Sequence, residues 1–510
     1  MMAYSEVNKR KIAKNTAFLY MRMFFTMFIS FYTSRVILEV LGVEDFGIYN
    51  VVGGITTAIV FFTGSLTNVT QRYYNLGLGQ EDTTLTSCYF NQFLLIFFIL
   101  ALLVLIIGEA LASWIVNILL SIPEPRREAA AWVYQFSLLA LILSLVQIPY
   151  QSAVIAHEKM DTFAYVSLFE SISRLAILYI LQALQGDKLV VYGGLYFLIC
   201  LSSFLVYAFY SHAKFEECFY RFYFSKPLAK EMLKFVSYNM YGCFAFSMCQ
   251  QGVNVLLNMF FGPAVNAARA LSLQVFQGVF RFSDNILTAV RPPIIKLYSQ
   301  GNRRQMVSLS ISATRYCLFL NALLVIPIIV NVDFILSVWL KKVPAYTTVF
   351  IIIVLIESNF NIANNMLTVL VNATGDLKRN QFYGRTFTLL ALPISYVALL
   401  WMKSPAIPML IILLSTFFYW LNNVRDAHIQ VRLGYTDYFK QIIFPTAVLY
   451  ACLSPLSYAV KSCMAEGWLN LIATTVVCTV LGLSVIYGLL LNTTERSFVR
   501  DKIQIALKKT

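Results

Sequence analysis

The sequence predicts an all-α polytopic membrane protein with about fourteen transmembrane helices. Of its 510 residues, 59% are hydrophobic and only 13% are charged, against about 25% charged in a typical soluble protein. The mean hydropathy of +0.70 agrees with this reading. Apolar runs long enough to cross a bilayer recur from end to end, and the longest polar break, residues 211–231, is too short to fold alone.

These runs place the expected helices with boundaries uncertain by several residues. We expect spans at roughly 16–40, 48–76, 85–118, 128–155, 162–184, 190–212, 232–260, 264–292, 308–334, 346–373, 381–401, 406–428, 440–459 and 467–491.

An internal repeat groups the first twelve spans into two sets of six. Gly42–Gly47 joins spans one and two, as Gly262–Asn266 joins spans seven and eight, and Arg72 and Arg291 close corresponding spans. Six spans is an even number, so both sets insert the same way up, and such repeats normally place the site between the lobes. The predicted parts are an N-terminal six-helix lobe at 1–212, a cytoplasmic inter-lobe loop at 213–231, a C-terminal six-helix lobe at 232–435, and two extra transmembrane helices with a basic cytoplasmic tail at 436–510.

The formal net charge of +14 does not indicate nucleic-acid binding. Most Lys and Arg residues fall in short loops on one side of the predicted spans, which is the positive-inside pattern. The pattern and the even number of spans predict a multi-pass protein with both termini cytoplasmic.

No catalytic group or metal site is expected. The nine cysteines form no CxxC pair and the three histidines do not cluster. We also find no nucleophile motif and no glycine-rich phosphate loop. The sequence therefore predicts a protein that is not an enzyme and has no cofactor, with Na⁺ or H⁺ as the candidate coupling ion.

The most informative stretch is residues 262–300, which is mostly apolar but carries Arg269, Arg281, Asp284 and Arg291. A helical period puts a polar stripe on one face, formed by Gln274, Gln277, Arg281, Asn285 and Thr288. A central arginine facing lipid costs roughly 2.5–3.5 kcal/mol, so this face is expected to line protein or a water-filled cavity. In a competing interpretation Arg281 and Asp284 neutralise each other.

Two further sets of polar residues lie inside predicted spans. Gln250, Asn254 and Asn258 form a stripe that fits either sugar contacts or hydrogen bonds between helices. Asp284 and Glu357 are candidate coupling-ion residues, although a buried carboxyl held neutral explains Glu357 equally well.

The segment Lys14–Ile55 resembles the start of bacterial polysaccharide transporters, the Wzx-type oligosaccharide-lipid flippases. The resemblance lies in a first span that leads through a short turn, Leu41–Gly42–Val43–Glu44–Asp45–Phe46–Gly47–Ile48–Tyr49, into a second span. Those flippases belong to the multidrug/oligosaccharidyl-lipid/polysaccharide exporter superfamily. The resemblance implies two six-helix lobes in a V-shaped, MATE-like arrangement with a central cavity, plus two C-terminal helices, and alternating access.

The resemblance also implies a substrate and a location. The expected substrate is an undecaprenyl-diphosphate-linked glycan, such as an O-antigen, capsule or exopolysaccharide repeat unit, flipped to the periplasmic leaflet of the bacterial inner membrane. Membrane lipid, a glycan polymerase and chain-length proteins are the implied partners in polysaccharide and lipopolysaccharide biosynthesis. Family members are similar in using cavity arginines of spans one, two and eight, which correspond here to Arg22, Arg35, Arg72, Arg269, Arg281 and Arg291.

Several of these arginines also have interpretations that involve no substrate. Arg22 is near enough to the inner boundary to snorkel, Arg35 is spaced to pair with Glu39, and Arg72 fits a headgroup contact. Arg269 and Arg291 have no acid at i±3 or i±4 in their own helix.

Two other functions remain open. A drug/cation antiporter of the same fold predicts cavity carboxylates, and the predicted spans hold eight arginines against about six acids, which favours an anionic ligand modestly. A membrane glycan polymerase or ligase needs a large extracytoplasmic loop, and none is predicted.

Overall fold

The structure, a computed structural model of the chain, describes residues 2–114, 124–183, 186–340, 343–491, 495–497 and 500. The side chains before position 11 and most of those between positions 30 and 65 lie outside the description, as do a few elsewhere. The described residues form α-helices with short 3₁₀ and π segments and no strand. The predicted all-α fold class is therefore confirmed.

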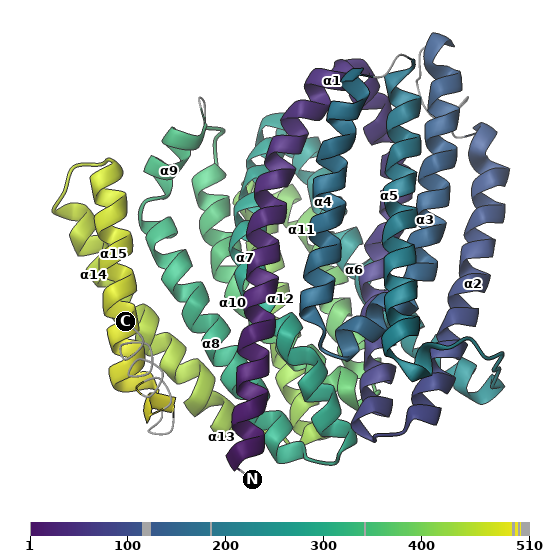
Figure 1. Ribbon diagram of the computed structural model, residues 1–510. Coiled ribbons are helices and arrows are strands. Elements are labelled where there is room, and N and C mark those ends of the chain that lie inside the picture. The colour runs from purple at the N-terminus through teal and green to yellow at the C-terminus, as the bar shows by residue number, and fades with distance from the viewer. Residues whose placement is uncertain are drawn as a thin grey trace, which may run out of the picture. The chain divides into compact units, whose positions relative to one another are not determined.

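The helices follow one another with short connections (Figure 1). The α-helices are α1 (Met2–Gly79), α2 (Thr83–Trp114), α3 (Arg127–Ala156), α4 (Met160–Ala183), α5 (Lys188–Lys214), α6 (Lys226–Phe261), α7 (Pro263–Ser299), α8 (Arg303–Val330), α9 (Val332–Trp339), α10 (Thr347–Thr374), α11 (Arg385–Trp401), α12 (Ala406–Val431), α13 (Tyr435–Tyr438), α14 (Phe444–Ser462) and α15 (Trp468–Val485). The 3₁₀ segments are η2 (Glu124–Arg126) and η3 (Glu216–Cys218), and the π segments are η4 (Lys378–Gly384), η5 (Phe439–Ile443) and η6 (Ile486–Leu490).

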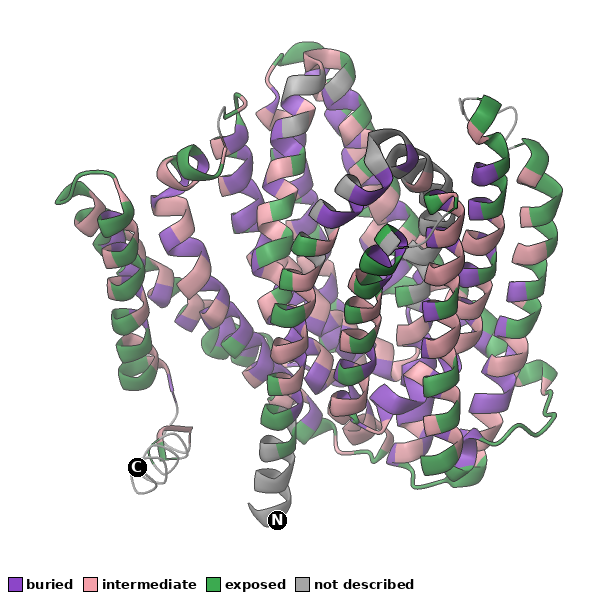
Figure 2. Ribbon diagram, turned by 45° about the horizontal axis from the view of Figure 1, so that its top comes forward, coloured by how far each residue is buried: buried purple, intermediate pink, exposed green. Residues whose placement is uncertain are grey.

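Ten helices within the described residues are long and apolar enough to cross a bilayer. They correspond to ten of the fourteen predicted spans, and the other four predicted spans fall on α1, α6 and α7. Most exposed side chains along the middle of α2 are apolar, including Phe98 at 59% exposure and Ile106 at 61%, and much of this helix is exposed in Figure 2. Such a face suits lipid. The chain is a multi-pass membrane protein.

The structure differs from prediction in the first two spans, because α1 is helical without a break from Met2 to Gly79. A straight helix of 78 residues would be about 117 Å long, several times the thickness of the hydrocarbon core. Figure 1 shows that α1 instead turns over near its middle and runs back. The expected reversal is therefore present, but the chain makes it with helical residues rather than with a loop.

The contacts divide the chain into two compact units. Unit 1 comprises residues 1–243 and 288–306, and unit 2 comprises residues 244–287 and 307–510, so α6 and α7 each contribute to both. The predicted lobe boundaries rest on the repeat and stay a prediction.

Unit 1 is built around α3, which packs against α1, α2 and α5. One apolar cluster joins α3 to the start of α5 through Val133, Leu138 and Leu189. A second cluster joins Leu19 of α1 and Ile155 of α3 to Ala289. The last part of α7 therefore belongs to the core of unit 1.

Unit 2 is built around α10, which packs against α12 and contributes to two apolar clusters. Phe350, Ile353 and Val354 of α10 meet residues from α6, α7, α11 and α12. The C-terminal pair packs on α8, where Phe319 and Ile326 contact Leu449 and Cys478. Because α10 lies at the centre, the polar residues along it are held in a largely dry environment.

Three helix ends in unit 1 meet at Glu158, which follows α3 with a left-handed φ of 60°. Its carboxylate lies 3.0 Å from Lys11 Nζ and 3.1 Å from Lys296 Nζ. Burial alone would raise the pKa of Glu158, but the two ammonium groups outweigh it and hold the pKa below its ordinary value. The ion triad therefore ties together the ends of α1, α3 and α7.

We predict that Glu158→Gln lowers the free energy of unfolding by about 1–3 kcal/mol at neutral pH, because two ammonium groups lose a buried partner. A depressed pKa means that this stability is complete above the ordinary pKa near 4.5 and is lost as pH falls through the lower folded-state value. Unfolding of the solubilised protein at neutral pH and at pH values down to 3 measures both effects.

The matched control is Glu81→Gln, since Glu81 also has a left-handed φ, 57°, but is exposed. The control should unfold like the wild type at every pH. A Glu158→Gln protein as stable as the wild type at neutral pH would contradict the role of the triad.

Candidate functional site

The exposed face of α7 in unit 2 is polar. Gln274, Gln277 and Arg281 are exposed and share one side of the helix, while Asn285 on the same stripe is buried and Thr288 is half-buried. Arg281 is the central residue of this 37-residue helix, about 27 Å from either end. The chain thus leaves an arginine uncovered halfway along a helix longer than a bilayer core is thick.

The part of α6 that belongs to unit 2 makes a useful contrast, because its exposed residues are apolar except for Gln251. Phe244, Met248, Val255 and Met259 recur on its exposed side. A lipid-facing surface of this protein is therefore built from large apolar side chains, and the exposed face of α7 is not of that kind. That face fits water or a polar ligand.

Arg269 precedes Gln274 by five residues on α7 and is fully buried, with 0% exposure. It donates hydrogen bonds to the backbone oxygen of Gln250 at 3.0 Å, to Gln250 Oε1 at 2.5 Å and to Asn254 Oδ1. The α6–α7 turn at Gly262, with φ of 80°, brings these residues together. The predicted amide stripe thus holds Arg269, and the Asn258 side chain lies outside the described residues.

A buried carboxyl completes this part of unit 2. Glu357 on α10 is 7% exposed and accepts hydrogen bonds at 3.0 Å from Asn361 Nδ2 and from Thr416 Oγ1. The Arg269 charge acts on it from a longer distance. Because both direct donors are neutral, the group can exist in either protonation state without losing a salt-bridge partner.

Asp284 does not pair with Arg281 in the described structure. It is half-buried and accepts a hydrogen bond from Asn365 Nδ2 at 3.4 Å. Further along α10, Asn364 accepts from Asn423 at 2.8 Å, and Asn423 accepts from Asn380 at 2.6 Å. A row of amides therefore continues from Glu357 toward the end of α10.

The predicted arginines of unit 1 have other surroundings. Arg22 lies over the ring of Phe163 at 4.6 Å. Arg72 is 5% exposed and lies between the rings of Tyr73 at 4.8 Å and Phe235 at 4.7 Å. Arg291 donates to Asn68.

The structure thus brings Arg269, Gln250 and Asn254 together and puts Gln274, Gln277 and Arg281 on one exposed face. The side chain of Arg35 lies outside the described residues. Within those residues, no group of three or more His, Cys, Asp or Glu side chains is placed to hold a metal ion. Assignment of any of these residues to ligand binding stays a prediction.

Sequence reasoning missed the partners from other helices. Thr416 bonds Glu357, Tyr419 lies beside Thr368 at 3.3 Å, and Asn423 lies in the amide row. These residues recur on one side of α12, at positions 416, 419 and 423. That helical spacing of polar residues inside an apolar span was the available signal.

We predict that the two arginines of α7 differ in their effect on stability. Arg269→Ala takes the donor away from the half-buried Gln250 and Asn254 oxygens and removes a fully buried side chain, so the free energy of unfolding should fall by about 2–4 kcal/mol. Arg281→Ala removes an exposed side chain and should change it by less than about 0.5 kcal/mol. Thermal unfolding of the two solubilised variants measures this, and equal losses would contradict the assigned environments.

No family model and no curated protein sequence matches the chain. Solved structures do match it. MATE in its bent conformation gives a TM-score of 0.73 at 11% identity over 83% of this chain and 96% of that one. A multidrug resistance MATE transporter of the MOP superfamily, in an outward-facing conformation, gives 0.70 at 11% over the same shares.

A third match is a MOP superfamily transporter from Pyrococcus furiosus Vc1, described by the reverse polarity of its binding pocket and a suggested different function. It gives a TM-score of 0.70 at 11% identity, covering 83% of this chain and 96% of that chain. Likeness at this level of identity establishes the fold. The chain therefore has the fold of the MATE transporters and their MOP superfamily relatives.

Proposed function

We propose that the protein is a transporter working by alternating access, and that its substrate is an anionic lipid-linked glycan, as in the Wzx-type flippases. The observation that carries this proposal is the exposed polar face of α7 with Arg281 at its centre. A membrane protein holds such a face where a charged or polar ligand passes. The substrate would be an undecaprenyl-diphosphate-linked oligosaccharide.

The residue types on this face suit the two parts of that substrate. A guanidinium binds phosphate oxygens through two parallel N–H donors, which favours Arg281 for the diphosphate. Gln277 and Gln274 lie four and seven residues away, about 6 and 10 Å along the helix axis. Their amides both donate and accept hydrogen bonds, as sugar hydroxyls do.

The sign of the exposed charge favours an anion over a cation. Three charged residues of α7 and α10 were predicted to bind the substrate or a coupling ion and differ in exposure. Arg281 is exposed, whereas Glu357 is buried and Asp284 is half-buried and hydrogen-bonded. The Pyrococcus transporter is described as having a pocket of reverse polarity on the same fold. A binding pocket of different polarity on this architecture therefore has a precedent.

An ion-coupled drug/cation antiporter is the second candidate. It is favoured by Glu357, a buried carboxyl with neutral hydrogen-bond partners that could take up H⁺ or Na⁺. The same residue could couple glycan transport to an ion gradient, so Glu357 does not by itself separate the two functions. The charge of the transported molecule does.

The proposed setting follows from the flippase assignment. We place the protein in the bacterial inner membrane with both termini cytoplasmic, where a glycan polymerase and chain-length proteins would act on the exported unit. Basic loops on one side of the spans support this orientation.

The test is leaflet accessibility of a fluorescent undecaprenyl-diphosphate oligosaccharide in proteoliposomes. Arg281→Ala should slow translocation about tenfold or more, because one charge-assisted phosphate contact is worth about 1.5–3 kcal/mol. Arg281→Lys should recover part of the rate, since it keeps the charge but loses the bidentate geometry.

The control is Arg127→Ala, which removes an exposed arginine whose ion pair with Glu124 is 3.7 Å long. It should translocate at the wild-type rate. Export of organic cations by a wild type that leaves the glycan lipid in place would reject the flippase and leave the antiporter.

A further inference from the structure

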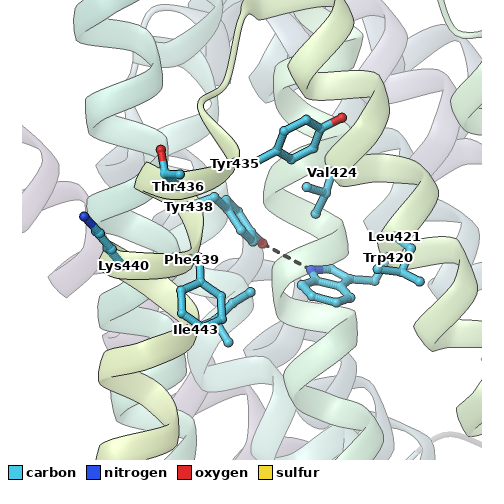
Figure 3. A pocket seen from close by; sticks show the side chains of 9 residues that line it. All are labelled: Trp420, Leu421, Val424, Tyr435, Thr436, Tyr438, Phe439, Lys440 and Ile443. Carbon is cyan, nitrogen blue, oxygen red and sulfur yellow. Dashed lines mark hydrogen bonds between the residues drawn. The ribbon is translucent and has the colours of Figure 1, made fainter.

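A groove of about 440 Å³ lies in unit 2, between the end of α12 and the start of the C-terminal helix pair (Figure 3). Its walls are aromatic and aliphatic, and Lys440 is the only charged residue among those that line it. The lining residues are Trp420, Leu421, Val424, Tyr435, Thr436, Tyr438, Phe439, Lys440 and Ile443.

The groove lies near one end of two candidate membrane spans, Ala406–Val431 and Tyr435–Ser462. Trp420 precedes the end of α12 by 11 residues, about 16 Å of helix, so the apolar walls reach well into the membrane-spanning part. Tyr435 and Thr436 lie at the other end, where the second span begins. A groove with this placement opens to the interfacial region and extends toward the hydrocarbon core.

A local irregularity shapes the groove. Phe439–Ile443 is a π segment, η5, within a continuous run of helix. Such segments are rare in proteins, and those that occur are often found at functional sites. Tyr438 is buried and its hydroxyl accepts a hydrogen bond from Trp420 Nε1 at 3.2 Å, as Figure 3 shows. Because these two polar groups satisfy each other, the inner walls present ring and methyl surfaces suited to a hydrocarbon chain.

One cationic residue, Lys440, lines the groove, and other polar and charged residues flank the lining residues in sequence. Lys440 is exposed and extends away from the rings in Figure 3. Arg425 is exposed one residue beyond the lining Val424, and the His428 ring stacks on that of Tyr435 with centroids 4.1 Å apart. Exposed Asp437 is the opposing charge on α13. Basic residues at the end of a span attract anionic headgroups.

We propose that this groove binds an anionic phospholipid, with one acyl chain along Trp420 and Phe439 and the headgroup phosphate at Lys440. The proposal does not depend on the transported substrate, because the groove lies on α12, α13 and η5 and shares no residue with the exposed face of α7. It gives the first of the two helices beyond the predicted repeat a role as part of a lipid site.

The test uses phosphatidylglycerol and phosphatidylcholine with brominated acyl chains, each at low mole fraction in vesicles containing the full protein. The difference in fluorescence between the wild type and Trp420→Phe isolates the Trp420 emission. Brominated phosphatidylglycerol should quench that emission at about one-fifth of the concentration needed with phosphatidylcholine.

Lys440→Gln should abolish the preference, while Lys403→Gln, which removes an exposed lysine beyond the end of α11, should preserve it. Equal quenching by the two lipids, or none, would overturn the proposal. Quenching by a brominated polyprenyl phosphate but not by phosphatidylglycerol would also overturn it, because the occupant would then be the substrate chain.

Discussion

The constraint on which the functional interpretation depends is the cost of an uncovered arginine halfway along a membrane-length helix. Arg281 is at the centre of α7, and the chain places Gln274 and Gln277 beside it on the same exposed face. Facing hydrocarbon, the guanidinium alone would cost roughly 2.5–3.5 kcal/mol or more. The exposed side of α2, by contrast, is built largely from apolar side chains such as Phe98.

The other arginine of α7 in unit 2, Arg269, avoids the same cost in another way. Arg269 is buried and meets two amide oxygens and a backbone oxygen, so its charge is solvated by the protein. Hydrogen-bonded burial of this kind fixes the rotation of α6 against α7. This pairing sets the direction in which the exposed face of α7 points. Arg269 therefore positions the helix, and Arg281 is left for a ligand.

Much of this architecture could be predicted from the sequence, because membrane helices are recognisable as long runs of high hydropathy. Length and hydropathy predict the all-α class and ten of the spans. The helical period predicts that Gln274, Gln277 and Arg281 share one side of α7. What could not be predicted depends on contacts between segments. One hydrogen-bond partner of Glu357 is Thr416, 59 residues away. The unbroken helix α1 and the π segment η5 have no periodic pattern of residues by which the sequence could reveal them. The rotation of each helix about its axis decides which carboxyls and amides meet. The chemistry of the substrate depends in turn on those contacts, so the sequence alone predicts it even less directly.

The central claim is that the exposed face of α7 is in contact with water. The direct measurement is the rate at which N-ethylmaleimide labels Gln277→Cys and Phe98→Cys in intact membranes, resolved by mass spectrometry so that the nine native cysteines do not interfere. Only a thiolate reacts quickly, and thiolates form in water. Fast labelling at position 277 and slow labelling at position 98 is the predicted result, and equally slow labelling at both would show that α7 faces lipid.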